Sequence, residues 1–347
     1  MQSIIGIDVG TTSIKCSAVL PDGTCYNNRC NTPSVRKSPS DSCEITFLPK
    51  EIWGCVRELI LPLIEKVDNV IISVVCQAPS LCFWDEKGDG IGVSYLSYYG
   101  DPTQNGYFQR KDKTIMRLAL GNRIMINSGF KYVSGLTGYI VFMLTGKVTL
   151  DSITAWEMGI ESQGDVLEMK RYFNTNIFPD VLAPLIPIPL NCTDLNFVQG
   201  ISLVGTTDSA ILPISTVSEF SDYYIYLGTW GSLLKSEIRT IESYNIQYHS
   251  GSLNTWLVSI PEFISKVEED VNVLDNLFLA AGKMTNEHSK IAICGGITNV
   301  KREYIHYLAN KYLKNRQVVI VPEKSGAYGA CRLAEISVKE RKDEKDY

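Results

Sequence analysis

Two short segments, one in each half of the chain, share a pattern of an apolar strand, a glycine–threonine turn and a second strand. They are residues 7–12 (IDVGTT) and residues 226–230 (YLGTW). Glycine allows a tight turn, and the backbone amide groups of such a turn bind anions such as phosphate. A chain with one phosphate-sized turn in each half is expected to form two similar α/β lobes that grip a nucleotide from both sides.

The residues around each turn support an α/β lobe. In the first half, short apolar runs bounded by turn residues predict strands, and an apolar stripe at helical spacing predicts a helix. The strands are expected at residues 4–8, 14–20, 24–30 and 70–76, and the helix at 51–67. In the second half, strands are expected at 223–227, 232–235, 290–294 and 317–321, and helices at 263–278, at 301–313 and from 326 onward.

The middle of the chain is expected to be helical and to end in a domain edge. Residues 112–190 have mostly helical periodicity and end in a proline-rich segment, 178–190, which favours a hinge or domain edge. We therefore expect an N-terminal lobe at residues 1–200 and a C-terminal lobe at 201–347.

Composition excludes several classes of protein. The chain has 347 residues, is 45% hydrophobic and carries a net charge of −5, a balance that does not favour nucleic acid or an anionic membrane as partner. No apolar run is long enough for a membrane helix, and the N-terminus lacks a basic, apolar leader, so a cytoplasmic protein is expected. The ten cysteines form no Cys-x-x-Cys pair and are expected to be reduced thiols.

The first candidate site is residues 6–15 (GIDVGTTSIK). The turn at Gly10, Thr11 and Thr12 offers amide and hydroxyl groups to phosphate oxygens. Asp8, at the end of the preceding strand, is placed to hold Mg²⁺ directly or through water. Lys15 either adds positive charge or points to solvent. The alternative for the whole segment is an ordinary hairpin.

The second candidate is residues 205–210 (GTTDSA), where Asp208 lies between a strand and an expected helix beginning near Ser209. Asp208 is either the N-cap of that helix or the carboxylate that accepts the proton of an attacking hydroxyl group.

Two further elements favour the catalytic alternative. Gly228 and Thr229 form the second phosphate-sized turn. Residues 292–299 (AICGGITN) form a strand that ends at Gly295 and Gly296, followed by Asn299, where a purine would lie against exposed backbone.

Together these elements resemble the FGGY carbohydrate kinases, a family that includes xylulose, glycerol, rhamnulose and sedoheptulose kinases. Residues 5–15 resemble the family's opening phosphate motif, and Asp208 falls where the family carries its catalytic aspartate. Gly228 and Thr229 match the second phosphate motif, and residues 295–299 the adenosine motif. Residues 144–151 (LTGKVTLD) and the helix from Gly326 also resemble family segments.

The resemblance implies an α/β, two-lobed, actin-like ATPase fold of the ribonuclease H-like type, with an ATP cleft between the lobes. It implies ATP and Mg²⁺ as cofactors and a small sugar or polyol as substrate. The substrate contacts would be Asp8, Gln77, Ala78 and Asp101. A homodimer is left open.

The sequence departs from the family at three points. Gln77 is followed by Ala78 and Pro79 where polar sugar-contacting residues are common, and residues 101–103 (DPT) lack the arginine of the family's Asp-x-Arg segment. The stretch between Lys235 and Lys290 is shorter than is usual in the family. The alternative is therefore a catalytically impaired, nucleotide-binding relative that acts as a sensor or interaction module. A P-loop and a Gly-x-Ser-x-Gly elbow are both absent from the sequence.

Overall fold

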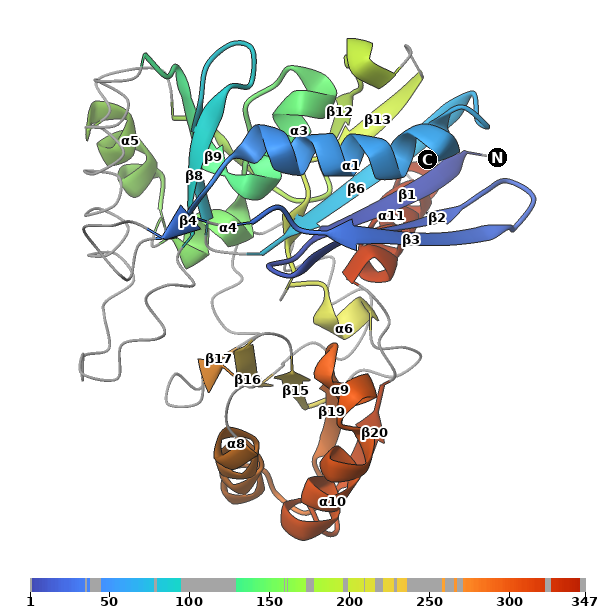
Figure 1. Cartoon of the computed structure of the whole chain (residues 1–347), viewed down its shortest axis with the longest axis vertical. Coiled ribbons are helices and arrows are strands. Elements are labelled where there is room, and N and C mark those ends of the chain that lie inside the picture. Colours follow the sequence, from blue (N-terminus) through green and yellow to red (C-terminus); the bar gives the residue numbers. More distant parts are fainter. Residues whose placement is uncertain are drawn as a thin grey trace. The chain divides into compact units, whose positions relative to one another are not determined.

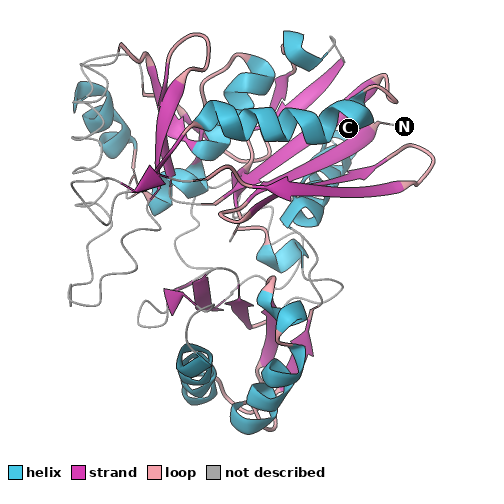
Figure 2. Cartoon of the chain, viewed as in Figure 1, coloured by secondary structure: helices cyan, strands magenta, loops and turns pink. Residues whose placement is uncertain are grey.

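The computed structural model of the chain describes residues 2–34, 36–37, 45–77, 80–94, 129–158, 160, 162–172, 178–195, 199–208, 210–215, 221–227, 230–235, 258–259, 265–266, 271–321 and 326–343. Both helices and strands occur throughout these residues, so the fold is mixed α/β, as expected (Figure 2). The chain forms two compact units. Unit 1 comprises Met1–Ile211 with Gly326–Tyr347, and unit 2 comprises Leu212–Ser325.

The main sheet of unit 1 is built on a parallel pair of buried strands, β1 (Ser3–Val9) and β6 (Asn69–Cys76). Its order is β12 (Pro187–Pro189), β13 (Gln199–Leu203), β6, β1, β2 (Ser13–Val19) and β3 (Cys25–Asn31). The short strand β14 (Thr206–Thr207) pairs in parallel with the end of β6. The first three strands, each within one residue or two of the predicted bounds, form an antiparallel meander (Figure 1).

Helices cover both faces of the main sheet. The side chains of β1 alternate between these two faces. Ile5, Ile7 and Val9 are fully buried in one core cluster with residues of α1 (Pro49–Ile64) and α3 (Leu136–Thr145). Gly6 faces α11 (Gly326–Asp343), because a Cβ atom at Gly6 would lie 2.0 Å from the carbonyl oxygen of Ala327. The absence of a side chain at Gly6 therefore lets α11 pack directly on β1.

A second sheet of unit 1 has the order β4 (Arg36–Lys37), β5 (Ile45–Phe47), β8 (Gly90–Ser94), β7 (Ser80–Trp84) and β9 (Tyr132–Gly135). The remaining elements of this unit are β10 (Leu150–Asp151), α4 (Ser152–Glu157), α5 (Gln163–Tyr172), β11 (Val181–Leu182) and the 3-10 turn η2 (Thr193–Leu195). Strands β10 and β11 pair in parallel.

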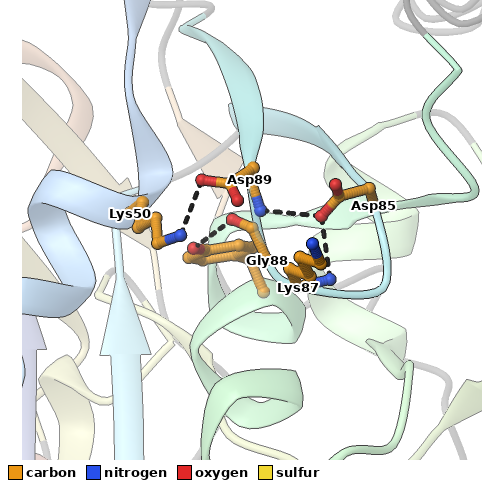
Figure 3. A network of polar contacts seen from close by, with 6 residues as sticks. Lys50, Asp85, Lys87, Gly88 and Asp89 are labelled. Atoms are coloured by element: carbon orange, nitrogen blue, oxygen red, sulfur yellow. Dashed lines mark hydrogen bonds and ion pairs between the residues drawn. The ribbon is translucent and has the colours of Figure 1, made fainter.

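The turn between β7 and β8 is fastened to two helices (Figure 3). Asp85 Oδ1 accepts hydrogen bonds from the backbone amides of Lys87 and Asp89. Lys50, at the start of α1, pairs with Asp89 at 2.7 Å. The hydroxyl group of Tyr139 in α3 donates to the carbonyl oxygen of Gly88 at 2.8 Å. These contacts hold the second sheet of unit 1 against the helices of its main core.

Unit 2 is a smaller α/β unit. Its sheet has the order β17 (Val258–Ser259), β16 (Trp230–Lys235), β15 (Tyr223–Leu227), β19 (Lys290–Cys294) and β20 (Gln317–Ile320), and β18 (Ser265–Lys266) also pairs with β16. Its described helices are α6 (Leu212–Ser215), α8 (Val271–Met284), α9 (Ile297–Val300) and α10 (Arg302–Tyr312). Arg316 binds the end of α8, because its guanidinium donates to the carbonyl oxygens of Gly282 and Thr285.

Three expectations from the sequence need correction. The helix expected at residues 263–278 begins at Val271, and residues 265–266 form β18. The middle region is not mostly helical where it is described, since residues 129–190 include β9, β10, β11 and β12. The proline-rich segment is not a domain edge, because β12 pairs with β13 inside unit 1. Proline is tolerated there because β12 is an edge strand.

The compact units also differ in their bounds from the lobes expected at 1–200 and 201–347. Residues 201–211 and the closing helix α11 belong to unit 1. The physical reason is the packing of α11 on β1, β2 and β6. In the described part of the chain, none of the helices combines the length and apolar character needed to cross a bilayer.

Candidate active site

Three neighbouring strands of unit 1 end together at one edge of the main sheet. Val9 lies opposite Cys76 in the β1–β6 ladder, and Thr207 lies opposite Cys76 from the other side. The next residue along each strand is Gly10, Gln77 and Asp208. Two backbone hydrogen bonds keep these three residues side by side. The amide of Gln77 donates to Val9 O at 2.8 Å, and the amide of Asp208 donates to Cys76 O at 3.0 Å.

Asp8 and Lys15 form the charged part of this edge. They lie directly opposite one another in the β1–β2 ladder, and their side chains form an ion pair with a distance of 3.9 Å between Lys15 Nζ and Asp8 Oδ2. Asp8 is 7% exposed, and the side chain of Lys15 is 22% exposed. The alternative in which Lys15 points to solvent is therefore wrong, and its ammonium group lies beside the carboxylate.

The turn after β1 is tight. The amide of Gly10 donates to Ser13 O at 3.1 Å, and a Cβ atom at Gly10 would also lie 3.1 Å from that oxygen. Thr11 is half-buried and Thr12 is exposed. A turn that brings backbone this close together, with two hydroxyl groups at its tip, fits the binding of phosphate oxygens.

Asp208 is half-buried and is not a helix cap. The first helix after it, α6, begins at Leu212, four residues further on. The alternative reading of Asp208 as the N-cap of a helix beginning near Ser209 is therefore excluded by the position of α6. The backbone of Asp208 is fixed by the bond to Cys76 O, so its side chain is carried by a rigid sheet edge.

Gln77 is the third member of the edge. It is 7% exposed, and its Oε1 atom has no hydrogen-bond partner among the described residues. A buried amide oxygen normally accepts a hydrogen bond, so this atom fits a role in binding a polar ligand. Two other expected substrate contacts, Ala78 and Asp101, lie outside the residues that the structure describes.

Asp151 is a buried carboxylate near this edge that was not among the expected site residues. It caps α4, since its Oδ1 accepts a hydrogen bond from the amide of Thr154 at 2.9 Å, and it is 1% exposed. Burial raises its pKa to about 6. The sequence does contain a signal, because aspartate is a preferred N-cap residue at the start of a helix.

Cys76 lies among the carboxylates. Burial raises the pKa of its thiol well above the ordinary value, and the negative charges of Asp8, Asp151 and Asp208 raise it further. The thiol is therefore neutral, so Cys76 adds no negative charge between the acidic side chains.

In unit 2, two parallel strands likewise end at one edge. Tyr226 of β15 pairs with Cys294 of β19, and the backbone of Gly295 lies against Leu227. Gly295 has φ +111°, and a Cβ atom there would lie 2.3 Å from Leu227 O, so the position requires glycine. Gly296 follows directly and Asn299 is exposed on α9. Gly228 and Thr229 lie outside the described residues.

The residues at the unit 1 edge suit a phosphate-bound magnesium ion better than a metal held by protein alone. Among the described residues, no cluster of three or more His, Cys, Asp or Glu side chains is placed to hold a metal. Mg²⁺ commonly binds one or two carboxylates and keeps waters and substrate phosphates as its other ligands. Asp8, one buried carboxylate beside a phosphate-sized turn, fits that arrangement.

Comparison with known proteins identifies solved structures that have a similar fold. No family model matches the sequence, and no curated protein matches it. Among solved structures, a ligand-bound xylulose kinase from Lactobacillus acidophilus matches with a TM-score of 0.68 and 18% identity, covering 98% of this chain and 90% of that one. A gluconate kinase from the same organism has a TM-score of 0.68 at 17% identity, again with 98% and 90% covered.

A third similar structure is a Plasmodium falciparum glycerol kinase with ADP, with a TM-score of 0.65 and 14% identity over 98% of this chain and 90% of that one. The resemblance to FGGY carbohydrate kinases that the motifs indicate is thus confirmed at the level of the fold. The α/β architecture expected from that resemblance is confirmed with it.

Proposed function

We propose that this chain, which has the fold of the carbohydrate kinases, transfers the γ-phosphoryl group of ATP to a hydroxyl group of a small sugar, ketose or polyol. The observation that carries the proposal is that Gly10, Gln77 and Asp208 lie side by side at the ends of three adjacent strands. This arrangement supports the proposal because a tight glycine turn, an amide and a carboxylate lie side by side on one rigid edge.

The proposed roles follow from the spacing of the strands. Gly10 and Asp208 are separated by the strand that carries Gln77, and two strand spacings amount to roughly 10 Å. That distance has room for a phosphoryl group at the turn and an acceptor hydroxyl group at the carboxylate. Asp208 would orient the hydroxyl group and accept its proton, the task that phosphoryl transfer leaves to a carboxylate. Gln77 would position the acceptor.

The turn would hold the phosphates. Thr11, Thr12 and the backbone of Gly10 are the proposed ligands of the β- and γ-phosphate oxygens. Asp8 would hold Mg²⁺ directly or through its waters, and the ion supplies charge neutralisation to the transferring group. Lys15, paired with Asp8 at 3.9 Å, keeps this carboxylate in place and adds positive charge beside the turn.

Unit 2 would contribute the remaining nucleotide contacts. Gly228 and Thr229 are proposed as the second phosphate-binding turn. Gly295, Gly296 and Asn299 are proposed to border the adenosine, because glycines at a strand end leave backbone exposed for a flat ring to lie against.

The test is a panel of acceptors with ADP release as the readout. Pentuloses, heptuloses, hexuloses, aldonates and polyols are each added to the purified chain with MgATP. The proposal expects at least one acceptor to accelerate ADP release far above the rate with water alone. No acceleration by any acceptor, together with measurable ATP binding, would instead support the second candidate.

That second candidate is a nucleotide-binding relative that senses or binds a partner without transferring phosphate. Its motivation is the sequence at two substrate positions, where Ala78 follows Gln77 and no arginine follows Asp101 at the expected spacing. The residues of the phosphate turn and Asp208 are retained, which is why we favour the kinase.

A further inference from the structure

Thr32, which belongs to none of the motifs above, is fastened to the phosphate-binding turn. It follows β3 and is half-buried. Its hydroxyl group donates to Gly10 O at 2.8 Å, and its backbone amide donates to Thr12 O at 3.1 Å. One residue therefore binds the two carbonyl groups on either side of Thr11.

These two bonds fix the orientation of the turn. A peptide group is planar and trans, so the carbonyl of one residue and the amide of the next point in opposite directions. Holding Gly10 O toward Thr32 directs the amide of Thr11 to the opposite side of the turn. The bond within the turn, from the amide of Gly10 to Ser13 O at 3.1 Å, does not involve that carbonyl.

We propose that Thr32 is a positioning residue, which holds the Gly10–Thr12 turn in the form that binds the phosphates of the nucleotide. This inference rests on the proposed function and extends it to a residue outside the motifs. Thr32 would act through the turn and would not itself touch the phosphates. Loss of its hydroxyl group should therefore weaken nucleotide binding and leave acceptor binding unchanged.

The test compares Thr32→Val with Thr32→Ser. Valine keeps the shape and the backbone bond but loses the hydroxyl group, whereas serine keeps the hydroxyl group. Thr32→Ala, which also lacks the hydroxyl group, is the second variant and should behave as Thr32→Val does. The control is Thr24→Val, at the opposite end of the β2–β3 hairpin, where the amide of Thr24 binds Asp22.

Three quantities are measured. Calorimetry gives the MgADP affinity, and amide hydrogen exchange is followed at residues 10–13 without nucleotide. Steady-state kinetics gives KM for ATP and KM for the acceptor separately. Thr32→Val is expected to bind MgADP about three- to tenfold more weakly, the usual effect of one hydrogen bond, and to exchange the Thr11 amide faster. KM for ATP rises and KM for the acceptor stays constant, while Thr32→Ser and Thr24→Val match the unmodified chain.

Two results would overturn the inference alone: an unmodified chain that binds MgADP no more tightly than Thr32→Val, or a Thr32→Ser variant as weak as Thr32→Val. A failure of the unmodified chain to bind MgADP at all would refute the proposed function, and this inference with it. The two failures are therefore distinguishable in one set of titrations.

Discussion

Gly326, the first residue of α11, lies directly against the carboxylate of Asp8. A Cβ atom at Gly326 would be 2.6 Å from Asp8 Cγ and 2.7 Å from its Oδ2. The N-terminal end of a helix carries partial positive charge, which favours a carboxylate at this position. The place of Asp8 at the sheet edge is therefore set by two neighbours, Lys15 across the ladder and the backbone of α11 above it.

Gly326→Ala should impair phosphoryl transfer by displacing Asp8. The added methyl group cannot occupy its ideal position without moving the carboxylate or the helix, and a shift of about 1 Å in a positioning group can lower activity by about 100-fold. We expect kcat/KM to fall by about 10- to 100-fold and the Mg²⁺ concentration for half-maximal rate to rise. The control is Gly54→Ala, where no described atom beyond the backbone of its own helix lies within 4 Å of the new Cβ. Full activity in the Gly326 variant would show that Asp8 does not organise the metal.

Asp208→Asn should abolish most of the turnover without weakening nucleotide binding. The amide has the same shape but cannot accept the proton of the acceptor, and a positioned base contributes about 10²- to 10⁴-fold. Single-turnover rates and MgADP calorimetry separate the two effects. The control is Asp180→Asn, because Asp180 is an exposed carboxylate that pairs with Lys170. Unchanged turnover in folded Asp208→Asn would rule out this residue as the base.

Asp151 should make the chain less stable as the pH rises from about 4 to about 6. Its pKa is raised from 3.8 to about 6 by burial. In this interval the unfolded chain has released the proton and the folded chain retains it, so the free energy of unfolding falls with increasing pH. Asp151→Asn cannot ionise, and asparagine still accepts the capping bond from Thr154.

The stability of Asp151→Asn relative to the unmodified chain should therefore increase by about 2–3 kcal/mol between pH 4 and pH 7. Urea unfolding at several pH values measures the difference, with Asp180→Asn as the reference variant. A difference that stays constant over this range would show that Asp151 ionises normally in the folded chain.

Gly6→Ala and Gly54→Ala should change stability in opposite directions. At Gly6 the new Cβ would lie 2.0 Å from Ala327 O and 2.6 Å from the amide nitrogen of Cys331, so α11 must move away from β1. We expect a loss of about 1–3 kcal/mol. At Gly54, inside α1, alanine is expected to stabilise by about 0.5–1 kcal/mol because it favours helix. The urea midpoints of the two variants should lie on either side of that of the unmodified chain.

Two strands of unit 2 were predicted with the bounds that the structure has. The runs at β15 and β19 are apolar, lie between turn residues and occupy the predicted bounds. The start of α8 was not predictable, because apolar residues continue at helical spacing back to Val267 and Phe263. They flank residues 265–266, which pair as β18. Spacing alone does not distinguish a two-residue strand from a further helical turn.

Within the candidate site, sequence reasoning found residues that lie beside turns and missed contacts made over long distances. The hairpin at Gly10 predicts that Asp8 and Lys15 lie opposite one another, because register follows from the turn. Nothing local to Gly326 indicates that it meets Asp8, since the two are more than 300 residues apart in the sequence. Thr32 was missed for a related reason, because its role depends on the register of β3 and not on a motif.

The packing of α11 on β1 has a consequence for how the protein is made. Strand β1 acquires its covering helix only after all of unit 2 has been translated. Until then the α11 side of β1, including the bare backbone at Gly6, has no partner, and a loop of over 300 residues must close to cover it. Nascent chains stalled before residue 326 should therefore depend on chaperones, and unit 1 should become resistant to protease only after α11 has left the ribosome.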